Sequence, residues 1–302
     1  MFFCNLFQIA SFLRFSTNEY SISYGFPYLE PMKINNRLLV FLVFIGLFSF
    51  TSADQHIPDI THDSRLLANS WYALSAEKEA CYLQTYRLAT WQLEMEIKNR
   101  KPGGKPFAIV TDLDETALDN SAWSIKVLLE GKDYPDYWSD WEKAAKAPAL
   151  PGAIGFFKRA QDLQVPVFYI SNRLAKNLGG TISNLKNLGF PNADSVHIML
   201  KVSTSNKVER RNQVLKNHEI VMLLGDNLAD FDGVWEEAEA AKRSQSVKDL
   251  KSSWGEKFII FPNPMYGAWK DALFQYKRNI KPEIVDSVWK SQLKDYLKQY
   301  EF

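Results

Sequence analysis

The feature that most constrains this chain is an alternation of short, continuous apolar runs with helical stretches. Five runs fit β-strands: Phe107–Thr111, Val165–Ile170, Val196–Leu200, Ile220–Leu224 and Phe258–Phe261. Their residues are apolar at consecutive positions, which is typical of strands covered on both faces. Helical patterns lie between the strands, at Gly152–Leu163, Leu174–Leu188 and Lys207–Asn217. This alternation predicts an α/β fold with a five-stranded parallel sheet and right-handed crossovers.

A helical region precedes the first strand. Apolar residues recur at helical spacing across residues 63–100, and Lys101-Pro102-Gly103-Gly104 ends the pattern. One or two long amphipathic helices are expected there. Cys81 lies in this region among mostly apolar neighbours, and we expect it to be buried in the packing.

The start of the chain has the pattern of an export signal. Lys33 and Arg37 precede the uncharged run Leu38–Phe50, and small residues follow up to Ala53. A basic segment, an apolar segment and a small-residue site together indicate a secretory signal peptide at residues 32–53. The apolar run is shorter than the roughly 20 residues that span a bilayer. We expect a periplasmic or secreted protein, with an uncleaved membrane anchor as the alternative.

Residues 1–31 precede this signal, although a signal peptide normally opens a chain. We interpret them as an upstream extension or a mis-assigned start, with Met32 as the true first residue. The formal net charge of +1 indicates no concentrated basic face, so no nucleic acid polymer is expected as a partner. If the signal is cleaved after Ala53, Cys81 is the one cysteine that remains. We then expect no stable association with a membrane. The sequence leaves open whether the chain forms a homodimer.

Polar residues gather where the predicted strands end. Parallel strands bind ligands beyond their carboxyl ends, so these residues should share one crevice. The clusters are Asp112-Leu113-Asp114, Ser171-Asn172-Arg173, Ser205-Asn206-Lys207 and Gly225-Asp226-Asn227, with Asp230 close behind. Carboxylates grouped at buried strand ends repel one another unless a cation neutralises them. The pattern therefore indicates a metal-assisted site.

The order of these clusters resembles a known signature. D-x-D-x-T, then Ser, then Lys, then G-D-x-x-x-D is the order found in phosphatases of the haloacid dehalogenase (HAD) superfamily. The stretch Asp112–Asn120, DLDETALDN, is similar to that of class C nonspecific acid phosphatases, subfamily IIIB, which include bacterial outer-membrane and secreted enzymes. Further similar stretches are Ser75–Glu77, Ser171–Arg173, Ser205–Lys207, Gly225–Phe231 and Pro262–Trp269. The resemblance runs from about Trp71 to the C-terminus.

The resemblance implies a Rossmann-like HAD fold with a small helical accessory or cap region. Residues 54–104 would form an N-terminal helical region and residues 105–302 the catalytic domain, with a cap insertion at 121–150. The implied activity is that of a Mg²⁺-dependent acid phosphatase acting on small phosphomonoesters, such as aromatic phosphates and nucleoside monophosphates.

The resemblance also implies roles for the acidic residues. Asp112 would be the nucleophile that forms an aspartyl-phosphate, and Asp114 the general acid and then the general base. Mg²⁺ would be held by the Asp112 carboxylate, the Asp114 main-chain carbonyl and the Asp226 carboxylate. Asp230 would orient a metal-bound water or Lys207, or alternatively cap the N-terminus of a helix.

Phosphate binding falls to three other residues. Ser171, the backbone amide of Asn172 and the Lys207 ammonium would hold the phosphate oxygens. Lys201 is an alternative to Lys207, although the Ser-Asn-Lys stretch favours Lys207. Arg173 is expected to pair with a carboxylate or contact substrate, with a surface salt bridge as the alternative.

Two aromatic residues are candidates for substrate contact. Trp138 in the insertion and Tyr266 after the last strand match positions that flank the leaving group in similar enzymes, where stacking would contribute about 1 kcal/mol. Alternatively, these side chains simply pack the cap against the core.

Two other functions stay open. One is a narrow-specificity 5′-nucleotidase or a phosphotransferase of the same fold. The other is a non-enzymatic binding or storage protein, because plant vegetative storage proteins resemble this family and some lack the nucleophile. Many class C relatives are lipoproteins with a Cys after the signal peptide, whereas Ala53-Asp54 offers none.

Overall fold

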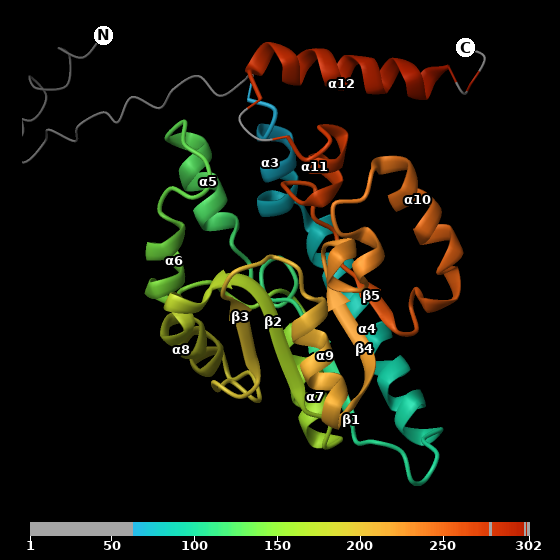
Figure 1. Cartoon of the computed structure of the whole chain (residues 1–302). Coiled ribbons are helices and arrows are strands. Elements are labelled where there is room, and N and C mark those ends of the chain that lie inside the picture. Colours follow the sequence, from blue (N-terminus) through green and yellow to red (C-terminus); the bar gives the residue numbers. More distant parts are fainter. Residues whose placement is uncertain (1–62, 278–279, 299, 301–302) are drawn as a thin grey trace, which may run out of the picture. The chain divides into compact units, whose positions relative to one another are not determined.

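Five parallel strands form one sheet in the computed structural model, which describes residues 63–277, 280–298 and 300. The strands are β1 (Phe107–Thr111), β2 (Val167–Leu174), β3 (Ile198–Lys201), β4 (Glu219–Gly225) and β5 (Phe258–Ile260). Their order is β3-β2-β1-β4-β5, and each neighbouring pair is parallel. The predicted α/β fold with a five-stranded parallel sheet is confirmed (Figure 1).

The predicted strand boundaries differ most at β2. This strand continues past the expected end at Ile170 and includes the polar residues Ser171–Arg173. It does so because β2 pairs with β3, although the register of the pair shifts between Ser171 and Leu174. Residues Ala175–Asn177 then form a 3-10 turn, so helix α8 begins at Leu178 and not at Leu174.

Helices cover both faces of the sheet. Successive strand residues point to opposite faces, so Ile109 belongs to one buried cluster and Val110 to the other. Side chains from α4 (Ala76–Lys98), α7 (Ala153–Asp162) and α8 (Leu178–Leu188) fill the first cluster. Side chains from α9 (Val208–Asn217) and α10 (Ala240–Asp249) fill the second. The continuous apolar runs of the sequence follow from this two-sided burial.

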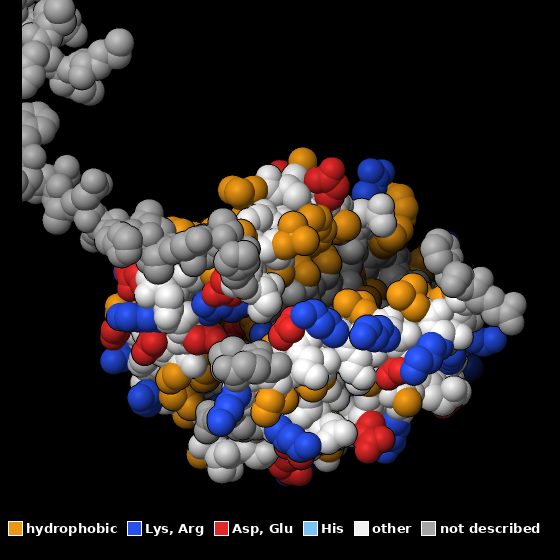
Figure 2. Space-filling view, turned by 90° about the horizontal axis from the view of Figure 1, so that it is seen from above, with side chains coloured by type: hydrophobic (Ala, Val, Ile, Leu, Met, Phe, Trp, Pro, Cys, Tyr) orange, Lys and Arg blue, Asp and Glu red, His pale blue; other side chains and the backbone are white. Residues whose placement is uncertain are grey.

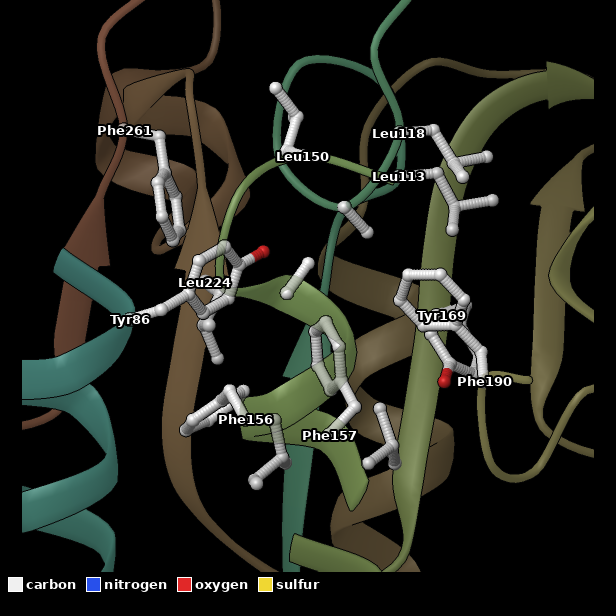
Figure 3. Close-up of a cluster of buried hydrophobic side chains, with 14 of the residues drawn as sticks. Tyr86, Leu113, Leu118, Leu150, Phe156, Phe157, Tyr169, Phe190, Leu224 and Phe261 are labelled. Atoms are coloured by element: carbon white, nitrogen blue, oxygen red, sulfur yellow. The ribbon is translucent and has the colours of Figure 1, made fainter. Parts of the chain in front are cut away.

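The first cluster also anchors the loop after β1. Leu113 and Leu118 are fully buried in it, together with Tyr86 of α4 and Phe157 of α7 (Figure 3). Each such side chain contributes about 1.5–3 kcal/mol to folding by burial. The acidic residues beside Leu113 are therefore held by hydrophobic packing directly below them.

The N-terminal helical region consists of two helices, α3 (Leu66–Leu74) and α4. Ser75 separates them in an extended conformation, and its hydroxyl accepts a hydrogen bond from the Lys78 amide at 3.2 Å, which caps α4. The expectation that Cys81 is buried is wrong, because Cys81 is exposed. Tyr82 and Tyr86 belong to the face of α4 that packs against the core, and Cys81 lies outside that face.

Two short helices occupy the insertion after the first motif, α5 (Ser121–Leu129) and α6 (Trp138–Ala144). Helix α6 packs against α8 so closely that a side chain at Gly180 would collide with the Glu142 carbonyl. The Asn177 amide also donates to the buried Glu142 carboxylate. The insertion is thus fixed to the sheet domain through the segment that follows β2.

The C-terminal part contains α11 (Ala268–Leu273) and α12 (Pro282–Leu297). Trp289 of α12 packs against Trp269 and Phe274, at ring-centroid distances of 6.2 and 6.0 Å. None of the helices in the described ranges combines the length and apolar character needed to cross a membrane. The predicted signal peptide at 32–53 and the upstream residues 1–31 lie outside the described residues.

Candidate active site

The polar clusters predicted from the sequence meet at the carboxyl edge of the sheet. Strand β1 lies between β2 and β4, so residues that follow these three strands are neighbours in space. Asp112 follows β1, Ser171 lies near the end of β2, and Asp226 follows β4. From β1 the chain continues to β2 and β3 on one side, whereas β4 and β5 lie on the other side, and ligands bind at such a reversal of strand order in open α/β sheets.

Lys207 joins two of the acidic residues. Its ammonium lies 2.5 Å from Asp112 Oδ1 and 2.6 Å from Asp230 Oδ1, and all three side chains are buried. Lys207, and not the alternative Lys201, therefore lies beside the predicted nucleophile. Asp230 also accepts a hydrogen bond from the Asn227 amide at 3.0 Å, within a capping box. Asp230 thus pairs with Lys207 and is also the N3 residue of a capping box whose N-cap is Asn227.

Asp226 completes an acidic cluster with Asp112 and Asp230. Each of the three can place a carboxylate oxygen within 4.8 Å of the others. Asn263 donates to Asp226 at 2.8 Å, and the Thr116 hydroxyl donates to it at 3.4 Å. Burial and the neighbouring Asp230 and Asp112 raise the pKa of Asp226 well above its usual range.

The pKa of Asp112 is raised in the same way. Burial raises the pKa of Asp112 to about 7, the Lys207 ammonium opposes this rise, and the charges of Asp230 and Asp114 add to it. One ammonium therefore does not fully compensate this group of carboxylates.

A divalent cation fits this cluster. Mg²⁺ binds oxygen ligands at about 2.1 Å, so the ligands of one ion lie within about 4.2 Å of each other. The donor set is all oxygen, and its atoms lie within 4.8 Å of one another, so small side-chain movements would bring them to that separation. Asp226 and Asp112 are the carboxylates that could hold the ion, with Asp230 beside them.

Asp114 is held by Arg173 in a two-pronged ion pair. Arg173 Nη2 and Nε lie 2.7 and 2.9 Å from Asp114 Oδ1, and Nε lies 3.1 Å from Oδ2. The Arg173 side chain is only 1% exposed, so the pair is not a surface salt bridge. Ser171 donates to Asp114 Oδ2 at 3.3 Å, and Asn120 donates to Oδ1 at 2.9 Å. The predicted acid is thus fixed next to the predicted phosphate-binding serine.

Three polar residues of this site were not singled out from the sequence: Asn120, Asn263 and Arg210. Asn120 and Asn263 belong to stretches that the motif analysis noted, DLDETALDN and PNPMYGAW, but neither had a role there. Arg210 lies in α9, and its guanidinium contacts the end of β2, including the exposed Asn172. Nothing in the local pattern of α9 distinguishes it from a surface residue.

The two candidate aromatic residues are less closely connected to the site. Trp138 is half-buried and packs edge-on against Trp123 at 4.8 Å, while Arg173 lies over its ring at 5.8 Å. This contact agrees with the alternative that Trp138 packs the cap. Tyr266 is 39% exposed and its amide lies 3.4 Å from Asn263 Oδ1. The described aromatic contacts do not join Trp138 to Tyr266.

A cavity of about 330 Å³ lies next to Asp226. It lies between α10, α11 and the end of β5, and apolar side chains such as Leu228, Val247, Ile260 and Trp269 line it. On the face shown in Figure 2, acidic and basic side chains are interspersed among the coloured residues.

Comparisons with known proteins agree with this geometry. A family model described as HAD superfamily, subfamily IIIB (acid phosphatase) matches residues 68–269. The class C acid phosphatase from Bacillus anthracis with tungstate bound is 41% identical, with a TM-score of 0.73 over 77% of this chain and 97% of that one. A second structure of the Bacillus anthracis enzyme is also 41% identical, with a TM-score of 0.72, over 75% of this chain and 95% of that one.

A curated relative is acid phosphatase 1 from Solanum lycopersicum, which is 27% identical over 164 residues, or 52% of this chain. The match spans 57% of the tomato protein, so little more than half of that relative is represented. The family match covers more than half of this chain and includes every residue of the acidic cluster. The resemblance seen in the sequence is therefore confirmed, and the chain belongs to the HAD superfamily, subfamily IIIB, the acid phosphatase family.

Proposed function

We propose that this protein is a Mg²⁺-dependent phosphomonoester hydrolase that works through an aspartyl-phosphate on Asp112. The observation that carries the proposal is the placement of Asp112, which is buried between the Lys207 ammonium and a cluster of two further carboxylates. A carboxylate next to one fixed cation and one metal site is suited to attack a phosphate dianion, because both cations reduce the repulsion between them.

Asp112 acts as the nucleophile in this proposal. Lys207 holds Oδ1, so Oδ2 would form the bond to phosphorus while the ester oxygen leaves. Water would then attack the phosphorus of the aspartyl-phosphate, which restores the Asp112 carboxylate and releases inorganic phosphate. Phosphoryl transfer depends mainly on positioning and charge neutralisation, and buried ion pairs supply both.

Asp114 supplies and removes protons. It would protonate the leaving oxygen in the first step and take a proton from the attacking water in the second. Its contacts with Arg173 and Ser171 keep its carboxylate at the side of the site where Ser171, the Asn172 amide and Lys207 would bind the phosphate oxygens. Bound Mg²⁺ would be held by Asp112, the Asp114 carbonyl and Asp226, and would neutralise phosphate charge.

The proposed substrates are small phosphomonoesters, including aromatic phosphates and nucleoside monophosphates. Tungstate, bound in one Bacillus anthracis structure, is a tetrahedral oxyanion like phosphate. Trp138 and Tyr266 would contact the leaving group from the cap and from the segment after β5. We further propose that the signal at residues 32–53 directs the protein to the periplasm or the medium.

The replacement Asp112→Asn tests the proposal. The amide cannot attack phosphorus, so we expect turnover of p-nitrophenyl phosphate to fall by at least about a thousandfold, to the limit of detection. The circular dichroism spectrum should stay unchanged. Wild-type activity should disappear with EDTA and return with Mg²⁺.

The matched control is Asp286→Asn, which makes the same change on an exposed carboxylate paired with Lys290. This variant should keep wild-type activity. Substantial turnover by a folded Asp112→Asn protein would exclude the covalent mechanism. A wild-type protein without EDTA-sensitive phosphatase activity between about pH 4 and 7 would instead favour a binding or storage role.

A further inference from the structure

Arg210 connects the two segments that carry the proposed phosphate ligands. Its Nη1 donates to the Ser171 carbonyl at 2.6 Å, and its Nη2 donates to Asn172 Oδ1 at 2.7 Å. The same Nη2 lies 3.2 Å from the carbonyls of Ser205 and Asn206, directly before Lys207. One guanidinium thus holds the end of β2 next to the loop that leads into α9.

These contacts use Arg210 as a hydrogen-bond donor and not as half of a salt bridge. Within the ranges that the structure describes, no carboxylate lies within ion-pair distance of its guanidinium. All its partners are neutral oxygens, four of them main-chain carbonyls. A planar fork of donors can reach several carbonyls at fixed angles, whereas the lysine ammonium is a point charge on a flexible stem.

The contact with the Ser171 carbonyl fixes the direction of the next amide. A trans peptide is planar, so the carbonyl of Ser171 and the N–H of Asn172 point in opposite directions. Tyr134-Pro135 is the one cis bond among the described residues, so the bond between Ser171 and Asn172 is trans. Because Arg210 pulls the carbonyl towards α9, the N–H of Asn172 is directed away from α9.

Strand pairing holds only one side of this peptide, because Ser171 still pairs with Leu200 of β3, whereas Asn172 has no partner in the sheet. Pairing of β2 with β1 ends at Tyr169, and the register of β2 with β3 shifts between Ser171 and Leu174. Asn172 is exposed, in contrast to its buried neighbours Ser171 and Arg173. An irregular, exposed peptide needs a further contact to hold one orientation, and Arg210 provides it.

We propose that Arg210 is a positioning residue that sets the Asn172 amide as a phosphate donor. This inference rests on the proposed function, because it assumes that a tetrahedral oxyanion binds at this amide. Arg210 itself does not touch the phosphate. Its removal would let the peptide rotate, which withdraws the N–H and can turn a carbonyl towards the anion.

The adjacent Arg211 gives a contrast within the same helix. Its Nη1 donates to the carbonyls of Ala229 and Asp230, at 3.0 and 2.9 Å, so it holds the acidic segment after β4. Arg210 and Arg211 therefore support different halves of the site. A change at Arg210 should affect anion binding, whereas a change at Arg211 should affect the metal side.

The experiment compares Arg210→Lys, Arg210→Gln and Arg211→Lys with the wild-type protein. Tungstate binding in the presence of Mg²⁺ is measured by calorimetry, and Mg²⁺ binding is measured separately. A hydrogen bond to a charged group contributes enough for roughly a tenfold to hundredfold loss of affinity when it is removed. We expect that loss for tungstate in both Arg210 variants, an equal rise in KM, and unchanged Mg²⁺ affinity.

Two further variants complete the comparison: one separates the role of the Asn172 amide from that of the Asn172 side chain, and the other is a control. Asn172→Ala removes the side-chain contact with Arg210 but keeps the amide N–H, so its tungstate affinity should fall less than that of Arg210→Gln. Arg159→Lys, at an exposed pair with Glu94, should match the wild-type protein in every measurement.

The outcomes are distinct. Unchanged tungstate affinity in a folded Arg210 variant would overturn the inference, as would an Asn172→Ala protein that reproduces the whole loss. An equal fall in tungstate and Mg²⁺ affinity would show a general structural role and would also overturn it. A wild-type protein that binds no tungstate and hydrolyses no phosphomonoester would instead refute the proposed function itself.

Discussion

At the scale of single residues, the space around Gly225 decides where Asp230 lies. A side chain at Gly225 would place its Cβ 2.5 Å from both Cβ and Oδ2 of Asp230. Real contacts are never that short, so the larger residue would displace Asp230 and loosen its ion pair with Lys207. Glycine directly before Asp226 therefore lets the acidic segment approach the end of β4.

The replacement Gly225→Ala tests this packing. Overpacking costs about 1–3 kcal/mol, and the displaced Asp230 would no longer hold Lys207 against Asp112. We expect a lower unfolding midpoint in urea and at least about a tenfold loss of kcat. Gly155→Ala is the matched control, because nothing lies within 4 Å of the added Cβ in α7. Equal activity in both alanine variants would contradict the importance of this contact.

Site residues could be predicted from the sequence where they lie at the end of a recognisable strand or helix. Asp112, Asp114, Asp226 and Lys207 each follow or precede a strand or helix end, and the structure brings them together. The partner of Arg173 and the role of Arg210 could not be predicted, because a long side chain can reach several segments that are distant in sequence. Only the order of the strands in the folded protein shows which of these segments the side chain contacts.

At the scale of elements, helix α4 supports the loop after β1 from below. The Tyr82 hydroxyl donates to the Glu115 carbonyl at 2.5 Å, and the Tyr86 hydroxyl donates to the Thr116 carbonyl at 2.7 Å. Both tyrosines are buried. Two main-chain carbonyls of the loop after β1 therefore accept hydrogen bonds from α4, a helix that precedes the sheet in sequence.

The replacement Tyr86→Phe removes one of these donors. The buried Thr116 carbonyl would lose its partner, which costs about 1–3 kcal/mol. We expect lower stability in urea denaturation, with a smaller loss of activity, since Asp112 and Lys207 stay in place. Tyr296→Phe makes the same change on an exposed side chain and should be neutral. A Tyr86→Phe protein as stable as Tyr296→Phe would show that the hydroxyl is dispensable.

Element types were predicted more accurately than element ends. The five strands were recognisable because burial on both faces makes every position apolar. The end of β2 was not, since Ser171–Arg173 are polar although the strand continues through them to Leu174, which pairs with Lys201 of β3. The burial of Cys81 was predicted wrongly, because its apolar neighbours define one face of α4 and Cys81 falls beside that face.

At the scale of the whole molecule, the carboxylate cluster links stability to pH and to metal. Burial raises the pKa of Asp112 from its ordinary 3.8 to about 7, and raises the pKa of Asp226 as well. Without a divalent ion, the folded protein binds these protons more tightly than the unfolded chain does. The contribution of Asp112 to stability is therefore present at low pH and is lost as the pH rises through about 7, and the contribution of Asp226 changes in the same direction.

The replacement Asp226→Asn isolates this effect. In EDTA, we expect the wild-type protein to lose thermal stability relative to the variant as the pH rises, because ionisation of the buried Asp226 carboxyl is unfavourable and the variant has no carboxyl there. At about pH 4 the difference should shrink, since the wild-type carboxyl is then protonated. Added Mg²⁺ should stabilise the wild-type protein at neutral pH and leave the variant unchanged, as thermal melts in both buffers would show. A less stable variant in EDTA would mean that the cluster needs no cation.

The dependence of the β1 loop on α4 sets a limit on how far the protein can be shortened. A truncated form that began near Pro106 would keep every residue of the acidic cluster, yet Leu224 and Phe261 would lose the aromatic cover that Tyr86 gives them. Shortened forms made for crystallisation or assay should therefore begin before Leu66, so that both N-terminal helices are retained.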